Sequence, residues 1–121
     1  MIVEVRTYTV KPGKTAEYLR LYQSQGLAVQ SHHLGRLLGY YVSEVGNLNQ
    51  IIHMWAYDDY TDRDRRRAAL FSDQRWLTLV AQLYELIDHM ENKIVTPTSF
   101  SPAILERDRI GATGMDDGVD P

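Results

Sequence analysis

The sequence predicts an α+β domain of ferredoxin-like βαββαβ topology, with one antiparallel four-stranded sheet. Three observations lead to it. Short alternating apolar runs indicate strands, and longer runs with apolar residues three or four positions apart indicate helices. The two kinds follow one another as strand–helix–strand–strand–helix–strand. Right-handed crossovers then place the first and third strands side by side in the centre of the sheet.

Length and composition limit the possible functions. The 121 residues suffice for one domain, expected over residues 1–105, with a polar acidic tail over residues 106–121. The absence of cysteine excludes disulfides and thiolate sites. A net charge of −3 argues against a nucleic-acid binder, and no apolar run approaches the roughly 20 residues of a membrane span. The chain enters a strand at once, so we expect no targeting peptide and a cytoplasmic location.

The first strand and the first helix follow from simple patterns. Alternation over residues 2–10 puts five residues on one strand face: Ile2, Glu4, Arg6, Tyr8 and Val10. Pro12 and Gly13 mark the turn that ends this strand. A helix is expected from about residue 14, with a weak point at Gly26. Gly35 is the candidate for its C-terminal cap.

Two apolar strands should follow as an antiparallel hairpin. The second is expected over residues 36–45, and Gly46 and Asn49 tolerate the positive φ of the connecting turn. Alternation separates the second strand into two faces: Leu38, Tyr40, Val42 and Glu44 on one, and Leu37, Gly39, Tyr41, Ser43 and Val45 on the other. The third strand, to residue 57, is apolar on both faces and therefore central. One of its faces carries Ile51, His53, Trp55 and Tyr57.

Two helices and a short strand complete the domain. A helix is expected over residues 62–71, with acidic residues at its N-terminal end, where the helix dipole favours them. Ser72 or Asp73 can cap a longer helix that reaches about Glu91. That length rests on one regular apolar stripe: Trp76, Val80, Leu83, Ile87 and Met90. The last strand is expected over residues 93–96, before Pro97.

This topology covers one face of the sheet with helices and leaves the other face open. The two central strands are too apolar for contact with water, so an open face predicts a partner. A symmetric homodimer that stacks two open faces into a dimeric α+β barrel is the simplest solution.

Several short motifs follow one another in a fixed order: Glu4-Val5-Arg6-Thr7-Tyr8, Lys11-Pro12-Gly13, Leu34-Gly35, Gly39, Glu44-Val45-Gly46-Asn47-Leu48-Asn49, Met54-Trp55-Ala56-Tyr57, Arg63, Arg67, Asp73, Trp76, Pro97 and Phe100-Ser101-Pro102. With them the chain resembles the NIPSNAP family from about residue 2 to residue 102. This resemblance implies the dimeric α+β barrel group, which includes cofactor-independent monooxygenases, isomerases and haem-handling proteins with pockets between sheet and helices. Animal relatives of this family are mitochondrial and carry targeting and adaptor-binding segments. We expect no such segments in this chain, which therefore resembles the shorter bacterial form.

His53, Trp55 and Tyr57 form the leading candidate site. His53 has the chemistry of a general base near neutral pH, and the two aromatic rings can stack on a flat aromatic or enone-like substrate. The alternative is that all three residues pack in the core or in the dimer barrel, which is the more common place for a strand histidine.

Arg6 and Tyr8 form a second candidate pair. Arg6 can bind an anionic or enolate oxygen, and Tyr8 can donate a hydrogen bond to it. The alternative is a salt bridge from Arg6 to Glu4 or Glu44. Tyr41 and Glu44 complete the residues expected to bind substrate. Strand register decides whether Arg6 shares a face with His53.

Two other clusters predict no site. His32 and His33 diverge on a helix and lack a spaced carboxylate partner, so no metal is expected. The arginines over residues 63–67 alternate with aspartates, which favours local ion pairs over phosphate binding. No cofactor is expected either.

The combined prediction is a homodimer that binds a small apolar or aromatic molecule. As an enzyme it would be a cofactor-free monooxygenase or isomerase, in which Arg6 and Tyr8 polarise a carbonyl and His53 moves a proton. The main alternative is a non-catalytic binding or scaffold module, and a haem-handling role is the third.

Overall fold

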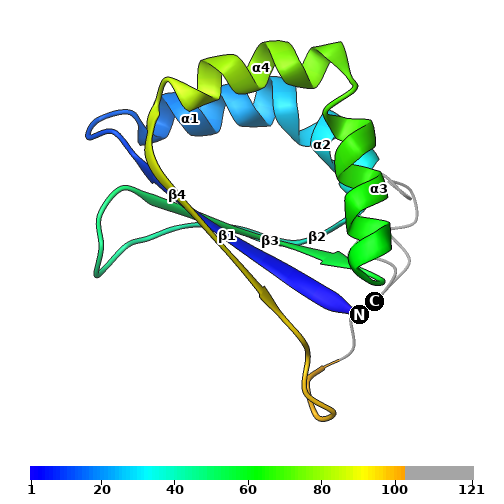
Figure 1. The fold of residues 1–121 in the computed structure, drawn as a ribbon. Coiled ribbons are helices and arrows are strands. Elements are labelled where there is room, and N and C mark those ends of the chain that lie inside the picture. Colours follow the sequence, from blue (N-terminus) through cyan, green and yellow to red (C-terminus); the bar gives the residue numbers. More distant parts are fainter. Residues whose placement is uncertain (103–121) are drawn as a thin grey trace, which may run out of the picture.

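In the computed structural model, which describes residues 1–102, helices cover one face of a curved sheet (Figure 1). The elements are β1 (Ile2–Val10), α1 (Thr15–Leu21), the π-helical turn η1 (Tyr22–Gly26), α2 (Leu27–Leu34), β2 (Arg36–Val42), β3 (Gln50–Tyr57), α3 (Tyr60–Leu70), α4 (Gln74–Tyr84) and β4 (Ile87–Val95). None of the helices described is long and apolar enough to cross a membrane. The predicted tail over residues 106–121 lies outside the described residues.

The sheet has the strand order β2-β3-β1-β4, and every neighbouring pair is antiparallel. The predicted ferredoxin-like topology, with the first and third strands in the centre, is therefore confirmed. The register also answers the question that the sequence left open, because Arg6 of β1 lies directly opposite His53 of β3. Residues at paired positions share a sheet face, so the two side chains point to the same side.

The inner face of the sheet, which the helices cover, holds the core. Ile51, Trp55 and Tyr57 of β3 are completely buried there, and so is Val10 of β1. From the helices, α4 adds its apolar stripe to the same cluster: Trp76, Leu79, Val80 and Leu83. The aromatic row of β3 therefore packs inside one chain, between sheet and helices.

A bulge in β2 corrects the predicted alternation of that strand. The register shifts between Leu37 and Gly39, so Leu37 pairs with Trp55 and Tyr40 pairs with His53. Both Leu37 and Tyr40 consequently pack against the core, although strict alternation had placed them on opposite faces. β2 also ends at Val42, three residues before its predicted end at residue 45.

The predicted long helix to Glu91 is wrong. α4 ends at Tyr84, and residues 87–95 form β4. The Leu86 carbonyl accepts a hydrogen bond from the Lys11 amide at 2.8 Å, and from Ile87 onward the chain pairs with β1. Ile87 and Met90 continue the helical spacing only by coincidence, because pairing with a central strand decides their conformation.

Two aspartates fix the starts of the last two helices. Asp59 caps α3 by accepting from the Asp62 amide at 2.7 Å, and Asp73 caps α4 by accepting from the Arg75 amide at 3.0 Å. α3 begins at Tyr60, two residues before the predicted start. Asp73 also accepts from His33 at 2.9 Å if that ring nitrogen carries the proton, which ties α2 to the start of α4.

The predicted weak point at Gly26 is a place of close helix packing. Gly26 ends the π-helical turn, and a Cβ atom built there would lie 2.6 Å from Leu79 Cδ2 and 2.9 Å from Tyr22 Cδ1. Its φ of −107° is one that any residue can adopt, so glycine is required by the close contacts with Leu79 of α4 and Tyr22 and not by the backbone conformation.

Gly26→Ala should therefore lower the free energy of unfolding by about 1–3 kcal/mol through overpacking, despite the better helix propensity of alanine. Urea denaturation measures this change. Gln25→Ala, an exposed substitution in the same turn, is the control and should stay within about 0.5 kcal/mol. Equal urea midpoints for the two variants would contradict this prediction, because they would mean that α4 moves to accept the added methyl group without loss of stability.

Candidate functional site

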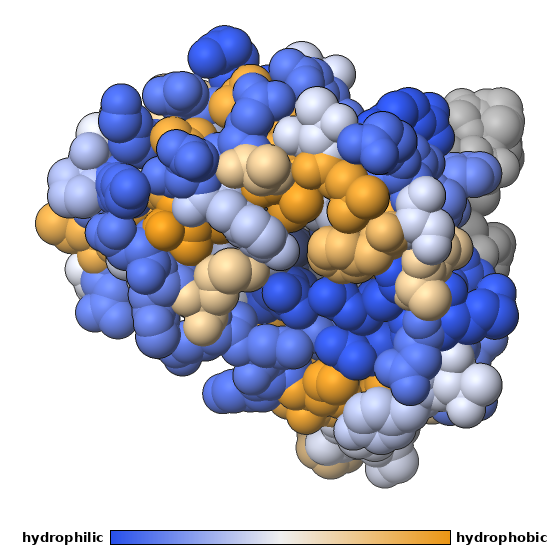
Figure 2. All heavy atoms as spheres, turned by 45° about the horizontal axis from the view of Figure 1, so that its top comes forward, coloured by the Kyte–Doolittle hydropathy of each residue, from blue (hydrophilic) through white to orange (hydrophobic). Residues whose placement is uncertain are grey.

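A small cavity of about 20 Å³ lies between the inner sheet face and the helices, and it widens to about 410 Å³ when the space open to solvent at its mouth is included. Figure 2 shows a recess on this side of the molecule, with apolar surface on one rim and hydrophilic surface on the other. Every layer of the fold contributes to its lining: Arg6, Tyr8, Tyr18, Gln30, His53, Arg67, Leu70, Phe71, Trp76, Val80, Leu83, Tyr84 and Ile87. Arg6, Tyr8 and His53, three of the predicted site residues, thus meet in one cavity.

The orientation and tautomer of His53 are set by its neighbours. The Trp55 indole donates to His53 Nδ1 at 2.8 Å, so in the neutral ring the proton is on Nε2. The Tyr40 ring stacks on the imidazole at 4.6 Å, and the Tyr8 ring meets it edge-on at 4.9 Å. Nε2 is buried and has no hydrogen-bond partner within residues 1–102. His53 therefore offers a free N–H at the cavity wall.

The surroundings of His53 favour this donor role over the general-base role expected from sequence. Burial, reinforced by the positive charge of Arg6, lowers the pKa of His53 to about 3. Its only basic nitrogen, Nδ1, already accepts from Trp55. At neutral pH the ring is thus uncharged and poorly suited to take a proton.

Arg6 forms one of the salt bridges expected from the sequence and also lines the cavity. It forms the salt bridge to Glu4 at 2.9 Å, and its Nε donates to the Tyr8 hydroxyl at 2.8 Å while the guanidinium lines the cavity. Arg63 of α3 donates twice more to Glu4, at 3.1 and 2.8 Å. Burial alone would raise the pKa of Glu4, but the bonds and charges of Arg63 and Arg6 outweigh it, and the pKa is lowered.

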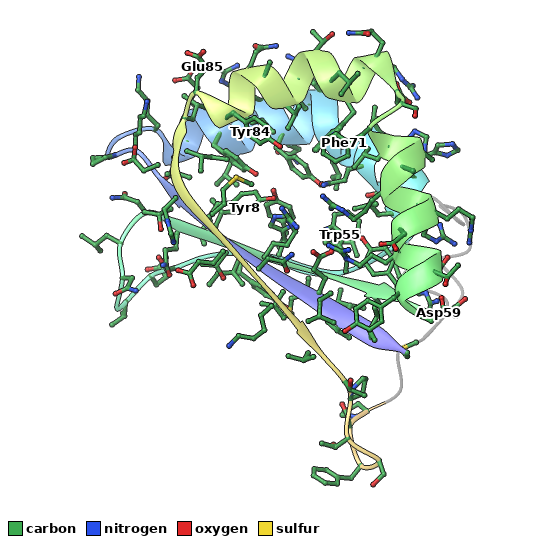
Figure 3. All side chains as sticks on the ribbon, viewed as in Figure 1. Tyr8, Trp55, Asp59, Phe71, Tyr84 and Glu85 are labelled. Atoms are coloured by element: carbon green, nitrogen blue, oxygen red, sulfur yellow. The ribbon has the colours of Figure 1, made fainter. Side chains whose placement is uncertain are left out.

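Tyr8 remains a donor. Burial raises the pKa of its hydroxyl, and the charge of Arg6 offsets this only in part. Because the oxygen accepts from Arg6, the phenolic proton is available to a ligand. Figure 3 shows the Tyr8 side chain between the sheet and the helices, on the same side as Phe71 and Tyr84.

The predicted substrate-binding residues divide into two groups. Trp55 and Tyr57 are completely buried and do not line the cavity, although Trp55 supports it through its hydrogen bond to His53. Tyr41 is 51% exposed and pairs with Ile52, whose side chain faces the open side of the sheet. Glu44 is exposed in the β2–β3 loop. Neither Tyr41 nor Glu44 reaches the cavity.

Several lining residues escaped the sequence analysis. Tyr18 and Gln30 line the cavity. The Tyr18 hydroxyl lies 3.0 Å from the Tyr40 hydroxyl, and Gln30 accepts from the buried Tyr22 hydroxyl. Four further lining residues come from α3, its C-terminal cap and α4: Arg67, Phe71, Trp76 and Tyr84. The helical stripe through Trp76 showed that α4 packs inward, but no local pattern shows which of its polar atoms lack partners.

The described part of the chain contains no group of three or more His, Asp or Glu side chains that could hold a metal ion. His32 is exposed, and His33 is bound to Asp73. His53 is poorly placed to ligate haem iron, because Trp55 occupies one ring nitrogen and the other carries the proton.

Comparison with known proteins gives consistent matches. The family model NIPSNAP matches residues 3–102. A NipSnap homolog 2 protein from Danio rerio is 32% identical over 84% of this chain, and a NipSnap homolog from Dictyostelium discoideum is 34% identical over 78% of it. The match covers only 35% and 41% of those two proteins, so the chain spans well under half of their length.

Solved structures show the same fold. A NIPSNAP family protein from Agrobacterium tumefaciens is 48% identical, with a TM-score of 0.82, over 84% of this chain and 96% of that one. A NIPSNAP domain protein from Burkholderia xenovorans is 35% identical, with a TM-score of 0.82, over 85% and 100%. An antibiotic biosynthesis monooxygenase is 13% identical over 81% and 99%, and its TM-score of 0.58 indicates a shared fold.

The geometry of His53 predicts an imidazole that stays neutral, with its proton on Nε2, from pH 8 down to pH 5. Because folding lowers its pKa, protonation favours the unfolded chain, so His53 weakens the fold progressively as the pH falls below 6.5. Long-range ¹H–¹⁵N spectra of the imidazole report charge and tautomer, with free histidine in the same tube as reference. Trp55→Phe removes the donor to Nδ1 and should abolish the tautomer preference. A charged His53 at pH 6 would contradict this geometry.

Proposed function

The chain belongs to the NIPSNAP family, and we propose that it binds a small, flat, largely apolar molecule with a carbonyl group in the cavity between sheet and helices. The proposed reaction is that of a cofactor-independent monooxygenase or isomerase. Its substrate is an aromatic or enone-like molecule whose carbonyl oxygen gains negative charge as the reaction proceeds.

The observation that carries this proposal is the Nε2–H of His53, which is buried and has no partner among the described residues. A buried polar group without a partner costs about 1–3 kcal/mol, so it calls for a ligand acceptor. Tyr8 and Arg6 line the same cavity with further donors. Fixed donors around one oxygen are the arrangement that stabilises a developing oxyanion.

The chemistry supported by these residues is stabilisation of charge. At neutral pH, His53 lacks a free basic nitrogen, Glu4 is bound by two arginines, and Tyr8 is protonated. The substrate must therefore have an acidic C–H bond and lose its proton to water. As an enolate held by His53, Tyr8 and Arg6, it can transfer electrons to O₂ or be reprotonated at another carbon.

A non-catalytic binding module is the second candidate. Trp55 and Tyr57 are completely buried and do not line the cavity, which fits a packing role. This candidate predicts a bound small molecule without turnover, so an activity measurement separates it from the enzyme.

The open sheet face supports a homodimer as part of the proposal. No described helix covers this face (Figure 1), and its central residues are half-buried in the single chain: Val5, Thr7, Ile52 and Met54. Apolar and β-branched side chains on two such faces can stack into one barrel.

Met54→Lys should convert the dimer into monomers, because each stacked sheet would then bury an unpaired ammonium group. Sedimentation velocity measures the mass of the particle. Thr78→Lys adds the same charge to the exposed surface of α4, on the other side of the molecule, and should leave the dimer intact. A monomeric wild-type protein would contradict this part of the proposal.

Turnover can be tested with anthrone, a flat ketone with an acidic C–H bond. One O₂ converts it into anthraquinone and water, and absorbance measures the product above the buffer background. His53→Phe keeps a ring against Tyr40 but removes the N–H, and should lower kcat/KM by roughly a hundredfold. Tyr41→Phe, on the open sheet face, should retain the full rate. An unchanged rate in His53→Phe would contradict the donor role, and circular dichroism verifies folding.

A further inference from the structure

We propose that the ligand of this cavity is an organic anion, a flat apolar acid whose carboxylate lies between Arg67 and Arg6. This inference rests on the proposed function, because it names the substrate class of the same cavity. It follows from three properties of the lining: an excess of donors, an excess of positive charge, and an apolar wall.

The polar atoms left free in the cavity are donors. His53 Nε2 and Trp76 Nε1 are both buried without a partner among the residues described, and each carries a proton that it can only donate. Two buried acceptors of the wall are already in use, since Gln30 Oε1 accepts from Tyr22 at 2.5 Å and the Tyr8 oxygen accepts from Arg6. A ligand that satisfies this wall must supply acceptor oxygens.

The charge of the lining also favours an anionic ligand. Two guanidiniums, those of Arg6 and Arg67, line the cavity, whereas no carboxylate of the described residues does. Both of them, together with Arg63, act on the buried carboxylate of Glu4. Arg63 and Arg6 bind Glu4 directly, whereas Arg67 has no acidic partner within residues 1–102 and only stacks against the Phe71 ring at 5.5 Å. A partly buried guanidinium of this kind is stabilised by an anion, and a carboxylate can accept from it in bidentate fashion.

The rest of the wall is apolar and fits the body of an aromatic acid. Leu70 of α3, Val80 and Leu83 of α4 and Ile87 of β4 face the cavity. Phe71 and Tyr84, which are 37% and 48% exposed, lie nearer the surface and can cover a flat ring. A free inorganic oxyanion would leave this wall unused.

The test uses 2-naphthoate, a flat acid that is anionic at pH 7.5, and 2-naphthamide, its neutral analogue of nearly the same shape. The chain has two tryptophans, so the ¹H–¹⁵N spectrum holds two indole N–H signals. Trp76 lines the cavity and Trp55 is bound to His53. Titration should shift the Trp76 signal, and 2-naphthoate should bind at least tenfold more tightly than 2-naphthamide.

Substitutions in α3 test whether Arg67 binds the carboxylate of the probe. Arg67→Gln should weaken 2-naphthoate roughly tenfold and leave 2-naphthamide unchanged, and Arg67→Lys should restore part of the affinity. Arg65→Gln removes the same charge from the exposed side of α3 and should have no effect. Equal losses in the Arg67→Gln and Arg65→Gln variants would mean that overall charge attracts the probe, and would overturn the Arg67 site.

The outcomes separate this inference from the proposed function. If both probes shift the Trp76 signal with equal affinity, the cavity binds flat molecules but the anion inference is wrong. If inorganic phosphate displaces 2-naphthoate at equal concentration, the site holds a small oxyanion and the aromatic acid is wrong. If neither probe shifts the signal at millimolar concentration, both the inference and the proposed binding function are wrong.

Discussion

The buried carboxylate of Glu4 is the group on which the sheet, α3 and the cavity all depend. It lies on the central strand β1 with no exposed surface, where an unpaired charge would be strongly destabilising. Arg63 reaches it from α3 with two hydrogen bonds and Arg6 reaches it along β1 with one. The ion pairs thus hold α3 against the sheet and direct Arg6 toward Tyr8. Such a network fixes geometry more than it adds stability.

Strand register carries this order into the cavity. Arg6, which binds Glu4, lies opposite His53 in the sheet, so its guanidinium is placed beside the imidazole. Trp55, two residues along β3, fixes the tautomer from behind, and Tyr40 of β2 stacks on the ring. Three adjacent strands therefore determine the orientation and charge state of one side chain that lines the cavity.

The sequence predicts the features that local patterns and the order of elements determine. It fails where contact with residues far away in the sequence sets a conformation or a charge state. Alternation placed Arg6, Tyr8 and His53 on the correct strand faces, and the order of elements identified the central strands. The end of α4 was missed because Ile87 and Met90 keep helical spacing while β1 pairs with them. The charge state of His53 was missed because burial and a hydrogen bond from Trp55, neither visible in a single sequence, set it.

The balance of groups in the cavity limits the kind of chemistry that the proposed enzyme can perform. Three titratable side chains, two in the cavity and one bound to Arg6, are in the states least suited to proton transfer: His53 is neutral with Nδ1 occupied, Tyr8 is protonated, and Glu4 is ion-paired. Its fixed donors and the Arg67 guanidinium, which has no acidic partner among residues 1–102, are instead suited to bind negative charge, an interaction that is strongest where water is excluded. A site of this composition lowers the energy of an anion that the substrate forms readily by itself. Reactivity then depends on the acidity of the substrate, and the protein contributes position and electrostatic stabilisation.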